Sequence, residues 1–320
     1  MRIAFFGTGE FSKNILEDLL KDYRVEVELV VSQPDKPVWR KKILEKTAVK
    51  ILAEQNNIEV LQPEKLWKNN EFLDYLDSLE LDFILVVAYW KIVPERVLKS
   101  AKYWAINLHW SILPKYRWAS PIQEAIKNWD TKTGLTVMYM SKWMDEWDIL
   151  EIKEVEIEEN DKTKDIFRKF EEFWAELAVD VMEKIVEWKI NPIQQNNDKA
   201  SYCSKISKED WEIDFKEQDW EEIYNKFRAY NPWPGIFTFY KWKKFNIEDC
   251  ELKTSPLAPL LKGEGEIPLW KVLKLSKKEI WIVCKNKKIL LLKQVKLEWK
   301  KSMDIISFIN WNKDFLDYKF

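Results

Sequence analysis

Short apolar runs alternate with helical patterns through the first half of the chain, and this alternation limits the fold more than any other feature of the sequence. The run Arg2–Phe6 ends in glycines at Gly7 and Gly9, and the segment after it has apolar residues at helical spacing, namely Phe11, Ile15, Leu16, Leu19 and Leu20. The run Phe83–Ala88 is apolar without alternation, as expected for a strand buried on both faces of a parallel sheet. The sequence therefore predicts an α/β fold with a doubly wound, mainly parallel, Rossmann-like sheet.

The chain also divides into two parts with different patterns. In residues 1–190, which we interpret as the first domain, further strands are expected at Val25–Val31, Ala105–Leu108 and Leu135–Met140, and helices at Ala48–Gln55, Pro121–Asn128 and Asp165–Trp188. The polar stretch at residues 191–205 is typical of a linker. In residues 206–320, short β-rich runs predict a small OB-like β-barrel, with strands at Ile236–Tyr240, Trp270–Leu275, Glu279–Cys284 and Ile289–Leu292.

Composition argues against several classes of protein. The sequence has no apolar stretch long enough for a membrane span, and its N-terminus is typical of a first strand rather than of a signal peptide. The three cysteines are far apart and lack metal-ligand spacing, which favours a reduced cytoplasmic protein without a bound metal. The net charge is −2, but from Ile206 onward 22 Lys and Arg stand against 18 Asp and Glu. This mildly basic part suits either contact with a phosphate backbone or an ordinary solvated surface.

The chain contains one histidine, His109, directly after the expected strand Ala105–Leu108. Asn107 lies two residues earlier, on the same side of that strand, and Asp145 follows another expected strand. All three side chains are expected at the carboxyl edge of the sheet, where open α/β sheets bind ligands. An amide can hold a developing oxyanion, a histidine can move a proton, and a carboxylate can orient the imidazole, so the trio suits acyl transfer between nitrogens. The alternative is a lone histidine that is merely packed and hydrogen-bonded.

Motifs along nearly the whole chain resemble, in order, those of the methionyl-tRNA formyltransferase family. The longest is NLHWSILPKYRWASPI at residues 107–122, which is similar to the family pattern N-L-H-[AG]-S-L-L-P-x-Y-R-G-A-x-P-I. Similar motifs in the first part are QPDKPVWR at residues 33–40, VVAYWK at 86–91, TGLTVM at 133–138 and MDEWDIL at 144–150. In the second part they are KISKEDW at residues 205–211 and RAYNPWPG at 228–235.

The resemblance implies an activity and a set of site residues. The activity is formyl transfer from 10-formyltetrahydrofolate to the α-amine of methionyl-initiator tRNA, by a cytoplasmic monomer that needs no metal. The implied catalytic residues are Asn107, His109 and Asp145. The implied folate-binding residues are Ser111, Ile112, Leu113 and Pro114, with Val87, Ala88 and Tyr89 as walls of the pterin pocket. The implied tRNA-binding loop contains Arg40, Lys41 and Lys42, which from composition alone would be a solvated basic loop.

Two alternatives in function remain open. The first is a formyltransferase that acts on an amino sugar or on glycinamide ribonucleotide. The basic loop and the C-terminal part argue against the glycinamide ribonucleotide enzyme, whereas the amino-sugar enzymes carry a related C-terminal part. The second is a non-catalytic RNA-binding protein, in which Asn107, His109 and Asp145 would not converge.

The tryptophan content is abnormal. The chain has 19 Trp and only 6 Gly, whereas average usage of Gly, about 7%, would give about 22. The departures from the family motifs are nearly all Trp in place of Gly, and Trp233 is the exception because the family has Trp there. We expect Trp110, Trp118, Trp129 and Trp147 to lie in tight turns around the active site, where backbone strain and lack of space favour glycine. Our hypothesis is that UGA codons, read as glycine in some bacterial lineages, are translated here as Trp. The alternative is a Trp-rich surface that stacks on bases.

Overall fold

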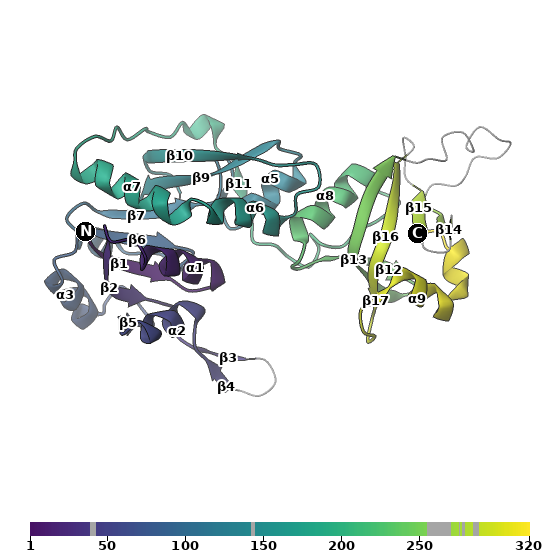
Figure 1. Cartoon of the computed structure of the whole chain (residues 1–320), viewed down its shortest axis with the longest axis horizontal. Coiled ribbons are helices and arrows are strands. Elements are labelled where there is room, and N and C mark those ends of the chain that lie inside the picture. The colour runs from purple at the N-terminus through teal and green to yellow at the C-terminus, as the bar shows by residue number, and fades with distance from the viewer. Residues whose placement is uncertain (39–42, 142–144, 255–269, 275, 277–278, 284–287) are drawn as a thin grey trace. The chain divides into compact units, whose positions relative to one another are not determined.

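The computed structural model of the chain describes residues 1–38, 43–141, 145–254, 270–274, 276, 279–283 and 288–320. Its contacts divide the chain into two compact units (Figure 1). Unit 1 comprises Met1–Pro121, Lys132–Glu156 and Phe167–Ser204, and unit 2 comprises Ile122–Thr131, Ile157–Ile166 and Lys205–Phe320. Unit 2 therefore includes two short segments that lie between segments of unit 1 in the sequence.

Unit 1 is built on a seven-stranded sheet with the strand order β10-β9-β7-β6-β1-β2-β5. Five neighbouring strands are parallel, namely β1 (Arg2–Gly7), β2 (Glu26–Val31), β5 (Glu59–Leu61), β6 (Phe83–Val87) and β7 (Ala105–His109). Beyond β7, β9 (Lys132–Tyr139) pairs antiparallel with β7, and β10 (Ile149–Glu156) pairs antiparallel with β9. The predicted mainly parallel α/β sheet is confirmed, whereas β5 and β10 were not expected from the sequence.

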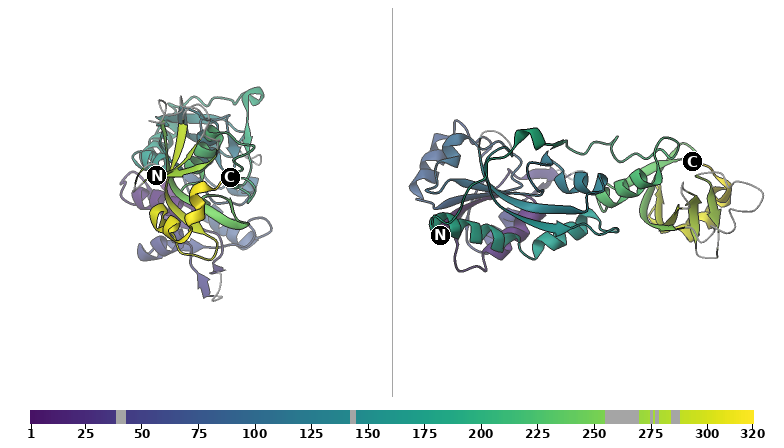
Figure 2. Two further views of the ribbon diagram at one scale, coloured as in Figure 1. Left: turned by 90° about the vertical axis from the view of Figure 1, so that its right-hand side faces the viewer. Right: turned by 90° about the horizontal axis from the view of Figure 1, so that it is seen from above.

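Helices cover both faces of this sheet (Figures 1 and 2). α1 (Glu10–Leu19) contacts α2 (Ala48–Gln55) and α7 (Trp174–Val186), and α3 (Asn70–Ser78) contacts α4 (Glu95–Leu98). Ala4 and Phe6 of β1 pack in one apolar cluster with α3 and α4, while their neighbours Ile3 and Phe5 are equally buried. Because both faces of β1 are covered, the strand has no polar alternation.

The helical pattern Asp165–Trp188 forms two helices, so the prediction of a single helix was wrong. α6 (Thr163–Glu171) ends before α7 begins, and Phe173 between them has φ −150° and ψ −2°, outside the helical region. The Phe173 side chain is buried, and its N–H donates to the carbonyl oxygen of Phe170. Apolar spacing continues through this turn because Phe173 itself enters the core, so periodicity could not reveal the break.

The carboxyl ends of β1, β6 and β7 lie at one edge of the sheet. Gly7 is level with Val87, and Val86 is level with Asn107. Gly7 also allows α1 to approach β1 closely, because a Cβ there would lie 2.7 Å from Cβ of Ser12. The connections contain two short strand pairs, the antiparallel β3 (Lys36–Val38) and β4 (Ile43–Glu45) and the parallel β8 (Arg117–Trp118) and β11 (Tyr202–Cys203). A 3-10 helix, η1 (Asn197–Lys199), precedes β11.

Unit 2 contains the expected β-rich part, a six-stranded antiparallel sheet. Its order is β12-β13-β16-β15-β14, and β17 pairs with β16. The strands are β12 (Ile236–Tyr240), β13 (Lys243–Thr254), β14 (Val272–Lys274), β15 (Ile280–Val283), β16 (Lys288–Leu297) and β17 (Met303–Asp304). The helices of this unit are α5 (Pro121–Lys127, whose first residue belongs to unit 1), α8 (Trp220–Tyr230), α9 (Ile305–Trp311) and the 3-10 helix η3 (Lys313–Asp317). A capping box of Asp219 and Glu222 begins α8.

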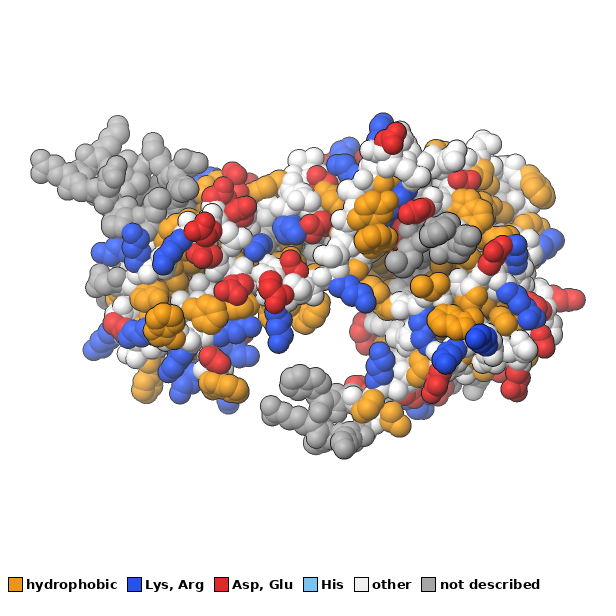
Figure 3. Space-filling model, turned by 180° about the vertical axis from the view of Figure 1, so that it is seen from behind, with side chains coloured by type: hydrophobic (Ala, Val, Ile, Leu, Met, Phe, Trp, Pro, Cys, Tyr) orange, Lys and Arg blue, Asp and Glu red, His pale blue; other side chains and the backbone are white. Residues whose placement is uncertain are grey.

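The surface carries charges of both signs. Figure 3 shows basic and acidic side chains interspersed over one face, with hydrophobic side chains at several separate places between them. This mixture agrees with the small net charge of the chain, −2. Among the residues that the structure describes, each helix is too short or too polar to cross a lipid bilayer.

Candidate functional site

His109 is the last residue of β7, at the carboxyl edge of the sheet, and only 4% of its surface is exposed. The two nitrogens of its ring face two acceptors. Nε2 lies 3.0 Å from the carbonyl oxygen of Tyr116, and Nδ1 lies 3.6 Å from Oδ2 of Asp145. A neutral imidazole could donate from only one of these nitrogens, whereas a charged imidazolium could donate from both. That charged ring can stabilise a negative oxygen and give up a proton.

Asp145 is held through both its backbone and its side chain. Its φ is 59°, in the left-handed region, which Asp tolerates better than most residues. Its Oδ2 also accepts a hydrogen bond of 2.8 Å from the backbone N–H of Trp118. The same carboxylate oxygen therefore faces the ring of His109 and a fixed backbone donor.

Asn107 lies two residues before His109 on β7, so the two side chains project from the same face of the sheet. It is half-buried, level with Val86 of β6 and with Met138 of β9. The structure thus brings Asp145, which is distant in sequence, beside the His109 ring, and Asn107 joins them through the strand that it shares with His109.

The segment after β7, predicted to line the folate site, is tied to β9. Thr136 donates to the carbonyl oxygen of Ser111 at 2.6 Å and accepts from the N–H of Leu113 at 3.3 Å. Gly134, also on β9, leaves room for Ile112, because a Cβ at Gly134 would lie 2.9 Å from Cγ1 of Ile112. Ser111 and Leu113 are buried, and Pro114 follows them in the same loop. These contacts attach the loop to β9 beside His109.

The end of β6 supplies the residues predicted to wall the pterin pocket. Ser12 donates to the carbonyl oxygen of Val87 at 2.8 Å, and Ala88 has a φ of 45°. Tyr89 is 2% exposed, its carbonyl oxygen accepts from Gln33, and burial raises the pKa of its phenol. Its hydroxyl is buried without a hydrogen-bond partner, as is that of Thr8, which follows β1. These strand ends therefore hold two unsatisfied hydroxyls.

Two residues that the sequence analysis did not single out lie next to Asp145. Arg117 of β8 is fully buried, and Gln195 is 6% exposed although it lies in the polar stretch interpreted as a linker. Gln195 bonds both Arg117 and the backbone of Asp145. Arg117 was present in the longest motif but had no assigned role, and the polar composition around Gln195 gave no sign of burial.

The four tryptophans expected in tight turns divide into two pairs. Trp118 and Trp129 have φ of 83° and 56°, whereas Trp110 and Trp147 lie in bends outside the left-handed region. Trp110 instead packs against Phe167, Phe170 and Trp174, with ring centroids 5.6–6.3 Å apart. Trp147 packs edge-on against Trp104.

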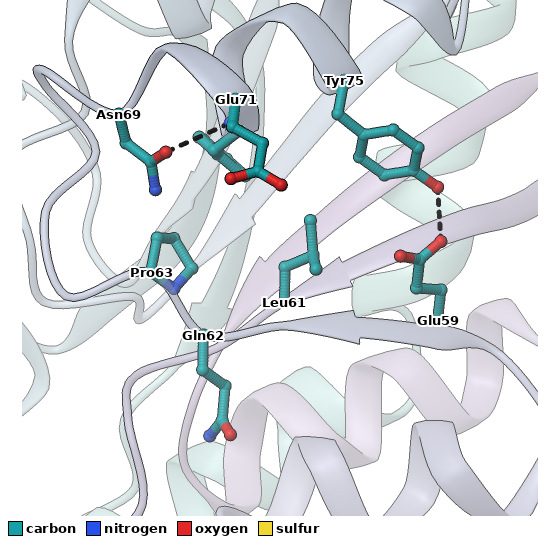
Figure 4. Close-up of a pocket in the computed structure, with 8 residues that line it drawn as sticks. Glu59, Leu61, Gln62, Pro63, Asn69, Glu71 and Tyr75 are labelled. Carbon is teal, nitrogen blue, oxygen red and sulfur yellow. Dashed lines mark hydrogen bonds between the residues drawn. The ribbon is translucent and has the colours of Figure 1, made fainter.

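The proposed tRNA contacts Arg40, Lys41 and Lys42 lie outside the described residues, between β3 and β4. A pocket of about 440 Å³ lies elsewhere in unit 1, between β5 and α3, and Figure 4 shows Tyr75 and Glu59 hydrogen-bonded at one side of it. β5 is at the opposite end of the parallel strands from β7, so this pocket is separate from His109. Within the described part of the chain, no group of His, Cys, Asp and Glu is arranged to hold a metal ion.

Comparison with protein families gives two matches that together cover most of the chain. Residues 1–182 match the family described as formyl transferase, and residues 205–313 match the formyl transferase C-terminal domain. The chain belongs to the formyl transferase family. Within this family it is 38% identical to the methionyl-tRNA formyltransferase of Sulfurimonas denitrificans, over 97% of this chain and 96% of that protein. It is 37% identical to that of Caldicellulosiruptor saccharolyticus, over 98% and 97%.

Two solved structures share the fold. The N-formyltransferase from Helicobacter canadensis, in complex with folinic acid and dTDP-3-aminofucose, aligns with a TM-score of 0.63 at 20% identity, covering 91% of this chain and 98% of that one. HypX from Aquifex aeolicus, in complex with tetrahydrofolic acid, aligns with a TM-score of 0.60 at 16% identity, over 99% of this chain and 47% of that one. At these identities the likeness concerns the fold alone.

Proposed function

We propose that this chain transfers the formyl group of 10-formyltetrahydrofolate to the α-amine of methionyl-initiator tRNA. The observation that carries the proposal is the pair of His109 and Asp145 at the carboxyl edge of a formyl transferase sheet. The named relatives support this acceptor because they are methionyl-tRNA formyltransferases aligned over nearly their full length. The lower-identity likeness to the sugar enzyme supports only the shared fold.

The residues at the strand ends fit a folate. Tyr89 and Thr8 each have a buried hydroxyl without a partner, which a heterocycle with its own donors and acceptors would satisfy. Val87 is level with Gly7, the residue that precedes Thr8 at the end of β1. The loop Ser111–Pro114 is the proposed opposite wall. When bound, the folate supplies a formyl group activated on its N10 nitrogen.

The side chains around His109 then have distinct tasks. Free α-amino groups have a pKa of about 7.7–8.0, so a useful fraction of the methionyl amine is neutral and nucleophilic near pH 7. We assign Asn107 and the protonated His109 to stabilising the oxyanion that forms when the amine attacks the formyl carbon. His109 next delivers a proton to the leaving nitrogen, and Asp145 holds the ring in orientation through Nδ1.

The tRNA contacts are assigned to two basic regions. Residues 1–190 would carry the transfer chemistry, and the basic loop with Arg40, Lys41 and Lys42 would lie on the acceptor end. The basic excess beyond Ile206 would follow the phosphate backbone. We also propose that the enzyme works in the cytoplasm, where initiator tRNA is charged, and that it acts as a monomer.

The test is a formylation assay with purified protein and 10-formyltetrahydrofolate. Methionyl-initiator tRNA, an amino-sugar nucleotide and glycinamide ribonucleotide are offered separately as acceptors. We expect formylmethionyl-tRNA and no product from the other two. Transfer to the sugar or to the ribonucleotide alone would reassign the acceptor, and binding of RNA without transfer to any acceptor would reject an enzymatic function.

A further inference from the structure

The buried guanidinium of Arg117 is the centre of a polar network in unit 1. Nε and Nη2 donate to Oε1 of Gln195 at 3.2 and 2.8 Å, and Nη2 also donates to Oδ1 of Asn197 at 2.8 Å. Nη1 donates to the hydroxyl of Tyr202 at 3.2 Å and lies 3.7 Å from Oε1 of Glu146. A fully buried cation needs such partners because burial removes its hydration.

The other end of Gln195 holds the turn that carries Asp145. Nε2 donates to the carbonyl oxygens of Asp145 at 3.0 Å and of Trp147 at 2.6 Å. Both hydrogens of the amide are thus used on one turn, while its oxygen is occupied by Arg117. Because the oxygen receives two donors from Arg117, the amide cannot flip without losing bonds at both ends.

The backbone on either side of Arg117 touches the catalytic pair itself. The carbonyl oxygen of Tyr116 faces Nε2 of His109, and the N–H of Trp118 donates to Oδ2 of Asp145. The position of β8 therefore determines both contacts. The guanidinium fixes β8 relative to Gln195, and Gln195 fixes the Asp145 turn, so one network sets the geometry of both groups.

We propose that Arg117 and Gln195 are positioning residues that hold Asp145 in register with His109. The proposal rests on the role of His109 and Asp145 in the proposed function. Neither residue touches the reacting atoms in this scheme. They act through Asp145, whose left-handed backbone needs external support.

The variant that tests this network is Gln195→Met, which keeps the length of the side chain and removes both donors and the acceptor. The control is Asn225→Leu. Asn225 is fully buried in unit 2, accepts from Arg228 and donates to the carbonyl oxygen of Lys127. It has the same chemistry as Gln195 but holds no part of the site.

We expect Gln195→Met to lower kcat by about 10- to 100-fold, the range seen when outer-shell partners are removed at metal sites, while the KM values for tRNA and folate stay within about twofold. On an Asp145→Asn background the same change should have almost no further effect on kcat, because the two act as one unit. Asn225→Leu should lower Tm and leave kcat unchanged. A normal kcat for Gln195→Met, or a fully additive loss on the Asp145→Asn background, would overturn the proposal.

A second readout does not depend on transfer activity. Because the chain has one histidine, isotope-labelled histidine gives one imidazole spectrum. At one fixed pH, Gln195→Met and Asp145→Asn should shift the His109 ring signals in the same direction, and Asn225→Leu should not. Unshifted His109 ring signals in Gln195→Met would reject the positioning role. If the signals shift as expected but the unchanged chain transfers no formyl group, only the proposed function is rejected.

An independent observation concerns the tryptophans. Eight of them have φ of +56° to +83°, namely Trp90, Trp104, Trp118, Trp129, Trp188, Trp242, Trp270 and Trp299. The chain has 19 Trp, and Trp39 and Trp143 lie outside the described residues, so nearly half of the others are left-handed. Positive φ occurs for a few per cent of non-glycine residues in general, and bulky residues there are outliers. The conformation therefore concentrates on the residue type least suited to it.

The ends of three helices show what this backbone requires. α5 and α7 each end with the paired hydrogen bonds of a Schellman motif, and the left-handed positions are Trp129 and Trp188. α2 ends with the same bonds, and its left-handed residue is Asn57, a type that tolerates this conformation. Glycine is the usual residue at such a position.

A hairpin repeats the pattern in unit 2. β12 and β13 are joined by Lys241 and Trp242, with φ of 50° and 65°, as in a type I′ turn. The preferred pair in that turn is Asn-Gly, with glycine at the second place, where Trp242 lies. Trp242 is 96% exposed and so gains nothing from burial.

We infer that these eight positions carry glycine in the chain that its own cells make, through UGA codons read as glycine. Trp233, where the family itself has Trp, is not left-handed, which agrees with a true tryptophan. At Trp118, glycine would keep the backbone N–H on Asp145 and remove an indole that packs on Tyr202 beside the site.

Two matched variants of the printed chain test the backbone argument. Trp188 and Trp311 are 87% and 86% exposed, but only Trp188 has positive φ. Trp188→Gly should raise Tm by about 2–4 °C, because it relieves left-handed strain, whereas Trp311→Gly should lower Tm or leave it unchanged. A fall in Tm for Trp188→Gly would contradict the inference.

Peptide mass spectrometry of the protein from its source cells decides the identity of the residues. We expect glycine at positions 129, 188 and 242 and Trp at 233, with UGA and UGG codons respectively. Tryptophan at 129, 188 and 242 in the native protein would overturn the inference.

Discussion

Among the described residues, each unit buries one arginine completely or almost so, and the two arginines make similar bonds. Arg117 in unit 1 donates to Gln195, Asn197 and Tyr202. Arg228 in unit 2 donates to the side chain of Asn225 and to the carbonyl oxygens of Asp161 and Glu158. Burial lowers the pKa of Arg228, since its charged form loses hydration.

The difference lies in what the amide partner holds. Gln195 carries the network on to the Asp145 turn, whereas Asn225 carries it to the end of α5 at Lys127. The chemistry of the two networks is nearly the same, and only the first ends at groups that face His109. Burial and hydrogen bonding therefore do not identify a functional residue, and the segment that the network restrains does.

The largest effect should come from the group at the reacting centre. His109→Ala should lower formyl transfer by about two to four orders of magnitude, the usual contribution of a general acid–base group. Binding of tRNA should be nearly unchanged. This loss sets the upper limit for what the Arg117 network can contribute, and it is measured as kcat in steady-state assays. Near-normal turnover of His109→Ala would show that His109 has no part in the mechanism. The Arg117 network would then have no more functional role than the Arg228 network.

The comparison between the two networks is tested by replacing each arginine separately. Arg117→Met and Arg228→Met should each lower the free energy of unfolding by about 1–3 kcal/mol, because each leaves buried acceptors unsatisfied. Only Arg117→Met should also lower kcat, by about 10-fold or more and less than His109→Ala. Urea denaturation and steady-state kinetics on the same samples separate the two effects. If both variants kept the kcat of the unchanged chain, both networks would be purely structural.

Charge in the basic loop should affect binding rather than positioning. Replacing Arg40, Lys41 and Lys42 by Gln should weaken tRNA binding and reduce its salt dependence by a slope of about 0.9 for each lost phosphate contact on a duplex stem. The kcat at saturating tRNA should be unchanged, and folate binding should persist. Binding measured across a salt series tests this, and an unchanged slope would make the loop an ordinary solvated surface.

The smallest expected effect concerns two buried threonines, and here the residue whose hydrogen bond matters is in unit 2. Thr133 in unit 1 has a buried hydroxyl without a partner, whereas the hydroxyl of Thr163 in unit 2 donates to the carbonyl oxygen of Ala229 at 2.6 Å. Thr163→Val should cost about 1 kcal/mol of unfolding free energy, and Thr133→Val should cost nothing or stabilise. Equal losses in urea denaturation would show that the Thr133 hydroxyl is satisfied in solution.

Sequence patterns alone predicted much of unit 1 and part of its proposed site. The buried strands were visible because continuous apolar runs mark them, and Asn107 and His109 were placed together because alternate residues of a strand share a face. Asp145 was proposed as their partner because it too follows an expected strand, and the family motifs imply the same role. In unit 2 the run for β12 was visible, but β13 was missed because its lysines and acids hide the alternation.

Only the folded chain decided which polar residues are buried. Gln195 and its partner Arg117 are 78 residues apart in sequence, and nothing local marks either one as a member of a network. The break between α6 and α7, and the left-handed backbone at Trp188, are equally invisible to periodicity. Local patterns record which residues prefer a strand or a helix. Which distant donor meets which acceptor depends on how the elements pack, because a buried polar group takes the partner that packing brings to it.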